Sequence, residues 1–175
     1  MTNTTTDLRR ETTTTDVGLL ILRIAIGATM LQAGLVKAVN FDTTAGFMES
    51  GGWRLPTLAA LMVTVAETLG GIGLLLGVLT PLAAFAVISA MIDAWAVNVS
   101  AGVIWSEPFN VPFLVVFATI GLLFTGAGTL SVDHWVFGRA NGPRSVAVTM
   151  TVAGFVVAVV TWVALNGTNP IHFTD

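Results

Sequence analysis

Residues 56–79, PTLAALMVTVAETLGGIGLLLGVL, decide the fold of this chain. The run is apolar and long enough for one helix to cross the ~30 Å hydrocarbon layer of a membrane. Its one charged residue, Glu67, stands about eleven residues from either end. At 1.5 Å per residue Glu67 would lie roughly 15–18 Å deep, where a carboxylate costs at least ~2.5–3.5 kcal/mol. We therefore expect Glu67 to have a partner, to be protonated or to face a polar cavity, and it is the first candidate functional residue.

The composition of the whole chain also favours a membrane protein. Of its 175 residues, 54% are hydrophobic and only 10% are charged, against roughly 25% charged in a soluble domain. There are no cysteines and two histidines, His134 and His172, so we expect no metal site and no cofactor held covalently or through metal ligands. The net charge is −3 without a basic cluster, which gives no electrostatic support to nucleic acid binding.

The apolar runs predict an all-α integral membrane protein, a four-helix transmembrane bundle with a fifth C-terminal transmembrane helix. Asp16 is the expected N-cap of the first helix. Residues 1–16 are polar and rich in threonine and predict a disordered tail. The expected spans are residues 17–39, 56–79, 81–99, 111–130 and 146–165, with a loop over 136–145 and a tail over 166–175.

Basic residues in the loops and at the ends of the spans predict the orientation. With the N-terminus inside, four arginines (Arg9, Arg10, Arg139 and Arg144) lie on the inner side and two basic residues, Lys37 and Arg54, on the outer side. This bias favours a cytoplasmic N-terminus and an external C-terminus in a multi-pass protein of a prokaryotic-type cell membrane. The segment 40–55 is then external, and its aromatic residues suggest that it lies in the interface or folds over the bundle.

Several polar residues are expected at one depth inside the bundle. Asp93 stands twelve residues after Pro81, and Glu67 twelve residues before Leu79, so both lie ~18 Å from the inner side. Gln32, in the first span, is expected at a similar level, ~22 Å from that side. These three residues predict a polar layer that could hold a proton or a quinone-type headgroup.

The second span also carries a polar stripe. Thr64, Glu67, Thr68 and Gly71 follow the i, i+3, i+4, i+7 spacing and share one helix face. Since lipid contact would penalise this face, we expect it to point into the bundle. Gly73 and Gly77 form a small-xxx-small pattern, for which close helix packing is the default interpretation.

Each candidate residue also has a structural interpretation. Arg23 could reach the cytoplasmic headgroups rather than a buried site, and Lys37, at the outer rim, is expected to anchor the helix at the interface. Glu67 and Asp93 could share a proton, or pair with an arginine, only to fix packing. Glu107 and His134 fall in loops, where a solvated residue is the default expectation.

These residues also resemble the pattern of a known family, the DoxX-type membrane proteins. The first span carries Arg23, Gly27, Gly34 and Lys37, and the second carries Glu67, Gly71 and Gly77. Glu107 precedes the fourth span, and the closing signature after it comprises Gly126-Ala127-Gly128, Ser131 and Asp133. The resemblance covers roughly residues 17–135. The chain departs from it at Thr80-Pro81, where many relatives carry a basic residue, in its Thr-rich tail, and in its fifth span, which suggests a docking helix for a partner.

The resemblance implies a four-helix bundle without its own redox cofactor, related to the DoxD small subunit of thiosulfate:quinone oxidoreductase. It points to an accessory, quinone-facing or anchoring subunit of a membrane oxidoreductase complex, non-catalytic itself, with a quinone or lipid as possible ligand. Its implied partners are the bilayer and other membrane or membrane-attached redox proteins. Two alternatives stay open: a structural or assembly protein in which the polar layer only fixes packing, and a small proton-coupled transporter built on the two carboxylates.

Overall fold

The computed structural model describes residues 12–173, all of whose regular elements are helices. Most of the predicted tail, residues 1–11, and the last two residues lie outside the described part. The seven helices of that part are α1 (Thr14–Val39), α2 (Phe41–Ser50), α3 (Pro56–Leu76), α4 (Thr80–Ser100), α5 (Val111–Thr125), α6 (Val132–Phe137) and α7 (Arg144–Leu165).

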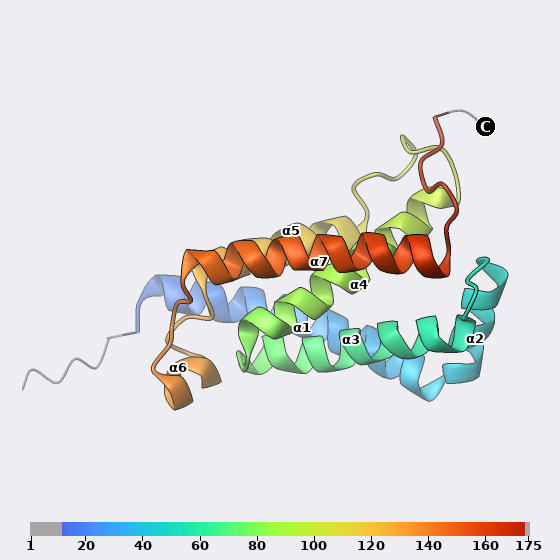
Figure 1. Ribbon diagram of the computed structural model, residues 1–175. Helices are drawn as coiled ribbons and strands as arrows, with labels where there is room; N and C mark the ends of the chain where they lie inside the picture. The colour runs from blue at the N-terminus through green and yellow to red at the C-terminus, as the bar shows by residue number, and fades with distance from the viewer. Residues whose placement is uncertain (1–11, 174–175) are drawn as a thin grey trace, which may run out of the picture.

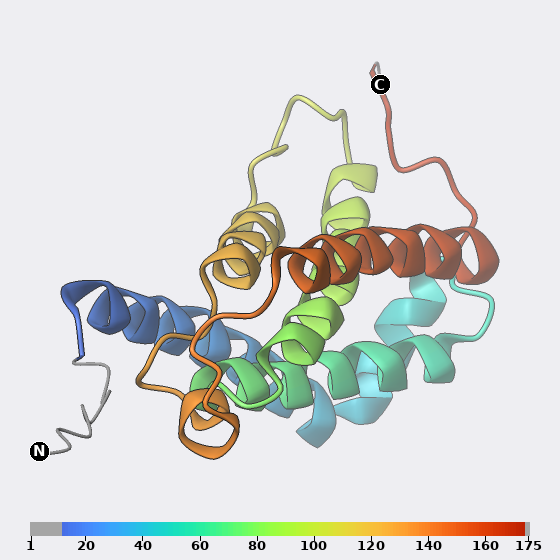
Figure 2. The same cartoon turned by 60° about the vertical axis from the view of Figure 1, so that its left-hand side comes forward.

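The long helices form two layers with α4 between them. Helices α1 and α3 lie side by side in one layer, and α5 and α7 lie in the other (Figure 1). Helix α4 runs obliquely between the layers and packs against α3, α5 and α7 (Figure 2). Its inward positions are small or branched, so the core forms around Ala84, Val87 and Ile88, which are fully buried.

Four helices of the described part are long and apolar enough to cross a membrane: α1, α3, α4 and α7. Helix α5, expected over residues 111–130, has 15 residues and ends at Thr125, a length of about 22 Å. It stops there because Gly126 takes a φ of +84°, which an L-residue adopts only with strain. The chain then folds back toward the start of α1, where Asp16 Oδ1 accepts a hydrogen bond from the Thr129 amide at 2.7 Å.

The N-cap of α1 is Thr13 rather than Asp16. The Thr13 hydroxyl accepts from the Asp16 amide, and the Asp16 carboxylate accepts from the Thr13 amide, which makes a capping box. The prediction placed the cap at the last polar residue before the apolar run. The helix begins one turn earlier because Asp16 serves as the third residue of the box.

The segment 40–55 folds over one end of the bundle. Its helix α2 packs on α3, and Met48 and Trp53 are buried in a second core cluster with Trp162 of α7. The rings of Trp53 and Trp162 meet edge to face with centroids 5.6 Å apart. This end of the bundle is therefore closed by a packed helix.

Candidate functional site

The polar stripe of α3 faces α1. Thr64, Glu67 and Gly71 are buried and Thr68 is half-buried. A Cβ added to Gly71 would lie 2.5 Å from the Leu31 amide nitrogen, so the two helix backbones nearly touch at this point. The expectation that Glu67 points into the bundle is confirmed, since its side chain is only 3% exposed.

Glu67 forms an ion pair with Lys37. The Glu67 Oε2 and Lys37 Nζ atoms are 2.6 Å apart, and the lysine side chain is 28% exposed. Lys37 was expected at the outer rim, but it lies in the last turn of α1, which ends at Val39, and its Nζ atom reaches the buried Glu67 carboxylate. The pair thus joins the two helices well inside the fold.

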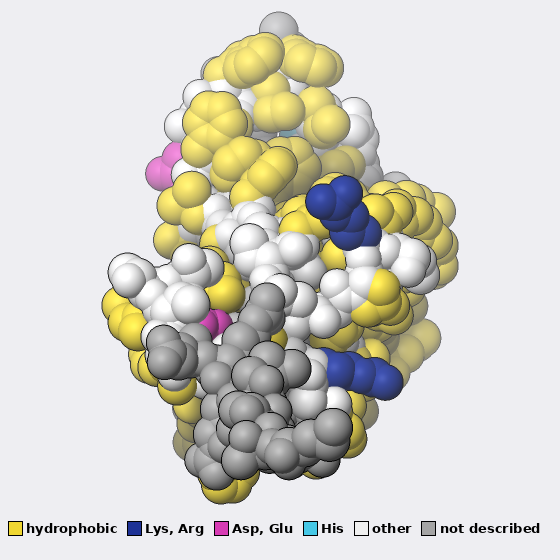
Figure 3. All heavy atoms as spheres, turned by 90° about the vertical axis from the view of Figure 1, so that its left-hand side faces the viewer, with side chains coloured by type: hydrophobic (Ala, Val, Ile, Leu, Met, Phe, Trp, Pro, Cys, Tyr) yellow, Lys and Arg dark blue, Asp and Glu magenta, His cyan; other side chains and the backbone are white. Residues whose placement is uncertain are grey.

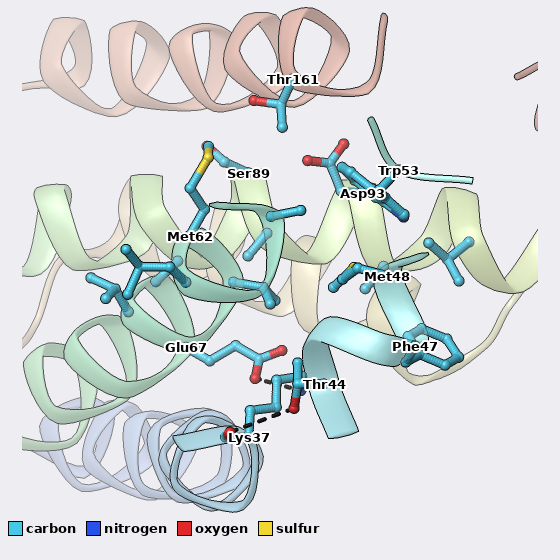
Figure 4. Close-up of a pocket in the computed structure, with 18 of the residues that line it drawn as sticks. Lys37, Thr44, Phe47, Met48, Trp53, Met62, Glu67, Ser89, Asp93 and Thr161 are labelled. Carbon is cyan, nitrogen blue, oxygen red and sulfur yellow. Dashed lines mark hydrogen bonds and ion pairs between the residues drawn. The ribbon is translucent and has the colours of Figure 1, made fainter. Parts of the chain in front are cut away.

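The ion pair stands in the wall of a cavity of about 910 Å³, which we call the Glu67 cavity. Its walls come from the end of α1, from α2, and from the facing sides of α3, α4 and α7 (Figure 4). Most of the lining is apolar. The residues that mark its extent are Lys37, Thr44, Phe47, Met48, Trp53, Met62, Glu67, Ser89, Asp93 and Thr161.

Asp93 lines the same cavity from α4. Its side chain points toward Trp53 and Thr161, away from the Lys37–Glu67 pair (Figure 4). Its Oδ1 atom is buried and has no hydrogen-bond partner among the described residues. The two carboxylates therefore border one space, Glu67 already paired and Asp93 with an unused acceptor.

The cavity also includes polar residues that the sequence analysis missed. Ser89 precedes Asp93 by one helical turn, so the i, i+4 spacing could have placed both on one face. Thr44 and Thr161 come from α2 and α7. No pattern in the sequence links these helices to α3, because their positions depend on how the bundle packs.

Arg23 lies in a different place, at the end of the bundle where α3 meets α4. It is 1% exposed, and its Nη2 donates to the Leu130 carbonyl oxygen at 2.6 Å. Of the two interpretations of Arg23, a side chain that reaches the headgroups and a buried one, the structure shows the buried one, because the chain after α5 covers it. Its Nε and Nη1 atoms are buried without a partner in the described part. With Gly77, Leu130 and Asp133 it forms what we call the Arg23 cluster.

Asp133 closes the turn between α3 and α4. Its two carboxylate oxygens accept from the backbone amides of Leu79 at 2.8 Å and Thr80 at 2.9 Å, and its own amide donates to the Gly77 carbonyl oxygen at 2.8 Å. These bonds satisfy donors that the first turn of α4 leaves free. Asp133 is thus a capping residue for a helix more than fifty positions earlier in the sequence.

Two predicted site residues lie outside any site. Gln32 is exposed and does not join Glu67 and Asp93. It was placed by depth alone, but it stands nine positions after the inward-facing Arg23, and at 100° per residue it points to about the opposite side of α1. Glu107 is also exposed, in the segment between α4 and α5.

The three glycines predicted to serve packing make different contacts. Gly71 meets α1, and a Cβ on Gly73 would lie 2.6 Å from the Ala83 side chain of α4. Gly77 is instead the C-cap of α3, with a φ of +66°. A Cβ there would overlap the Arg23 guanidinium, so Gly77 makes room for the buried arginine.

Two comparisons with known proteins match this chain. The model of the DoxX family matches residues 18–101. A Bacillus subtilis (strain 168) protein named "Putative oxidoreductase CatD" is 30% identical over 132 residues, which cover 73% of this chain and 93% of that protein. No solved structure matches the chain.

Proposed function

The chain belongs to the DoxX family, and we propose that it is an integral membrane subunit whose Glu67 cavity binds the headgroup of a lipophilic quinone. In this proposal the chain is an accessory component of a membrane oxidoreductase complex, and a partner protein supplies the electrons. The observation that carries it is the Lys37–Glu67 ion pair in the wall of a large, mostly apolar cavity.

The surface of the long helices supports membrane insertion. Their outward positions are large and apolar, among them Ile21, Leu69 and Val163, each 62% exposed. Water would penalise this belt, whereas hydrocarbon would not. The bilayer is therefore the first partner in the proposal.

The cavity suits a ligand with an apolar body and few polar atoms. Its volume of about 910 Å³ lies near the upper end of the ~300–1,000 Å³ range of small-molecule sites. The Lys37 ammonium has three donors and gives one to Glu67. A second donor is then available for a quinone carbonyl oxygen.

The opposite wall suits the reduced form of the same ligand. Asp93 Oδ1 is a buried acceptor without a partner in the described part. A quinol hydroxyl could donate a hydrogen bond to it. The Ser89 hydroxyl, which also lines the cavity, donates to the Phe85 carbonyl oxygen at 2.9 Å and could accept a hydrogen bond from a quinol hydroxyl. The two walls would thus orient the headgroup between them, and no electron transfer is assigned to side chains of this chain.

A quinone titration tests the proposal directly. Trp53 lines the cavity, so a bound short-chain benzoquinone such as decylubiquinone should quench its fluorescence. Lys37→Gln should weaken binding about tenfold, because a hydrogen bond from a charged donor is worth ~1.5 kcal/mol or more. Glu107→Gln removes an exposed charge outside the cavity and should bind as the wild type does. Equal affinity of the Lys37 variant and the wild type would contradict the site.

Purification tests the accessory role separately. The protein should retain quinone in mild detergent and co-purify with a redox protein. A solitary, quinone-free protein would count against both parts of the proposal.

A structural or assembly role is the second candidate, and the same ion pair favours it. Lys37 and Glu67 join α1 to α3 where the backbones nearly touch, so the pair could serve packing alone. In that case Lys37→Gln would lower the yield of folded protein, and quinone would bind neither variant nor wild type.

A further inference from the structure

A second cavity, of about 350 Å³, lies at the other end of the bundle. It opens between the start of α4, the end of α5 and the start of α7, beside α6. Its floor is apolar and includes Leu122 and Ala147, which are buried, together with the more exposed Leu82 and Met150. It shares no lining residue with the Glu67 cavity.

The rim of this cavity carries a positive charge. Arg139 lines it and is exposed, and Arg144, also exposed, begins α7 nearby. Basic side chains stand beside apolar ones on this end of the molecule (Figure 3). The one carboxylate in the lining is Asp133, whose two oxygens already accept the amides of Leu79 and Thr80 and which lies near the buried Arg23.

The neighbouring helix α6 has the composition of a segment at a membrane interface. Trp135 is 90% exposed, and Phe137, 54% exposed, also lines the cavity. Aromatic side chains with this exposure gather at the headgroup level of a bilayer. The mouth of the cavity is thus positioned where lipid headgroups would meet it.

We propose that this cavity binds an anionic phospholipid. One acyl chain lies along the apolar floor, and the phosphate lies against the Arg139 guanidinium, which can donate two parallel hydrogen bonds to it. Basic pockets between membrane helices hold anionic lipid headgroups in this way. The apolar floor favours a lipid over free phosphate, because inorganic phosphate has no acyl chain to bury there.

Native mass spectrometry of the detergent-purified full chain tests the proposal. The protein is titrated with phosphatidylglycerol, phosphatidylcholine or inorganic phosphate, and the bound fraction gives each dissociation constant. Phosphatidylglycerol should bind most tightly. Arg139→Gln should weaken its binding about fivefold, the effect of ~1 kcal/mol for one basic residue at a membrane surface, and Arg139→Lys should keep most of it. Arg54→Gln, which removes a basic residue at the opposite end, should leave it unchanged.

Three outcomes would overturn the proposal. Equal binding of the two lipids would show that charge does not matter. Saturation by inorganic phosphate in the same concentration range would show a free-anion site. Full binding by the Arg139→Gln variant, with a helical content equal to the wild type, would place the lipid elsewhere.

Discussion

The two buried groups of charged residues in this molecule differ in what lies beside them. In the Arg23 cluster protein covers Arg23, and Asp133 borders the smaller cavity but both its carboxylate oxygens accept from backbone amides. In the Glu67 cavity the ion pair and Asp93 border an open space. Burial alone therefore does not indicate a ligand site. A carboxylate whose oxygens are both bonded to backbone amides stabilises the fold, whereas a carboxylate with an unused acceptor beside a cavity can bind a ligand.

The largest effect should come from filling the space that Gly77 leaves for Arg23. Gly77→Ala places a methyl group against the guanidinium at a φ of +66°, and we expect a loss of about 3 kcal/mol in unfolding free energy. Gly138→Ala is the matched control, because its φ is +65° with nothing within 4 Å of the added Cβ; it should lose only about 1 kcal/mol. Thermal unfolding in detergent, followed by circular dichroism, measures both. Similar losses would show that Arg23 can move aside.

The next largest effect should come from the cap of α4. Asp133→Ala leaves the Leu79 and Thr80 amides without their acceptor, and we expect about 2 kcal/mol of destabilisation. Asp133→Asn keeps one acceptor oxygen and should lose about half as much. The same melting measurement applies. Wild-type stability of the alanine variant would refute the assignment of Asp133 as a structural cap.

A smaller effect on stability is expected at the Glu67 cavity. Glu67→Leu leaves the Lys37 ammonium unpaired, but that lysine is 28% exposed and can regain water, so we expect a loss of about 1–2 kcal/mol, less than for a sealed pair. Glu67→Gln can still accept from Lys37 and should lose less. The yield of monodisperse protein and its melting temperature report the difference. If both variants fold alike but lose quinone binding alike, Glu67 acts on the ligand rather than on packing.

The smallest effect should come from Gln32. Its side chain faces outward, so Gln32→Leu should change stability by no more than ~0.5 kcal/mol and should leave the quinone titration unchanged. A clear loss of quinone affinity would restore Gln32 to the polar layer and would contradict the helix orientation described above.

The sequence predicts well the features that depend on a single helix, such as its position in the chain and its inward face. Runs of apolar residues located α1, α3, α4 and α7, and the spacing of Thr64, Glu67 and Gly71 correctly predicted an inward face. Asp93 and Glu67 were expected to lie together, and they border one cavity. These results follow from helical periodicity, which is a local property.

The sequence could not predict contacts that depend on how different helices pack against one another. The Lys37–Glu67 pair depends on how the last turn of α1 packs against α3. Asp133 caps α4 only because the segment after α5 folds back on the turn between α3 and α4. Gln32 shows a different error, since its depth was considered and its angle around the helix was not.

The bond from Arg23 to Leu130 has a consequence for how the protein is made. The two residues are 107 positions apart. A ribosome adding about 5–20 residues per second completes Leu130 some 5–20 s after Arg23. During that interval α1 carries a cation whose final acceptor does not yet exist, and it needs a temporary one. Lipid headgroups within reach of a long side chain can serve this purpose, so the first helix would enter the membrane in one arrangement and complete its folding in another.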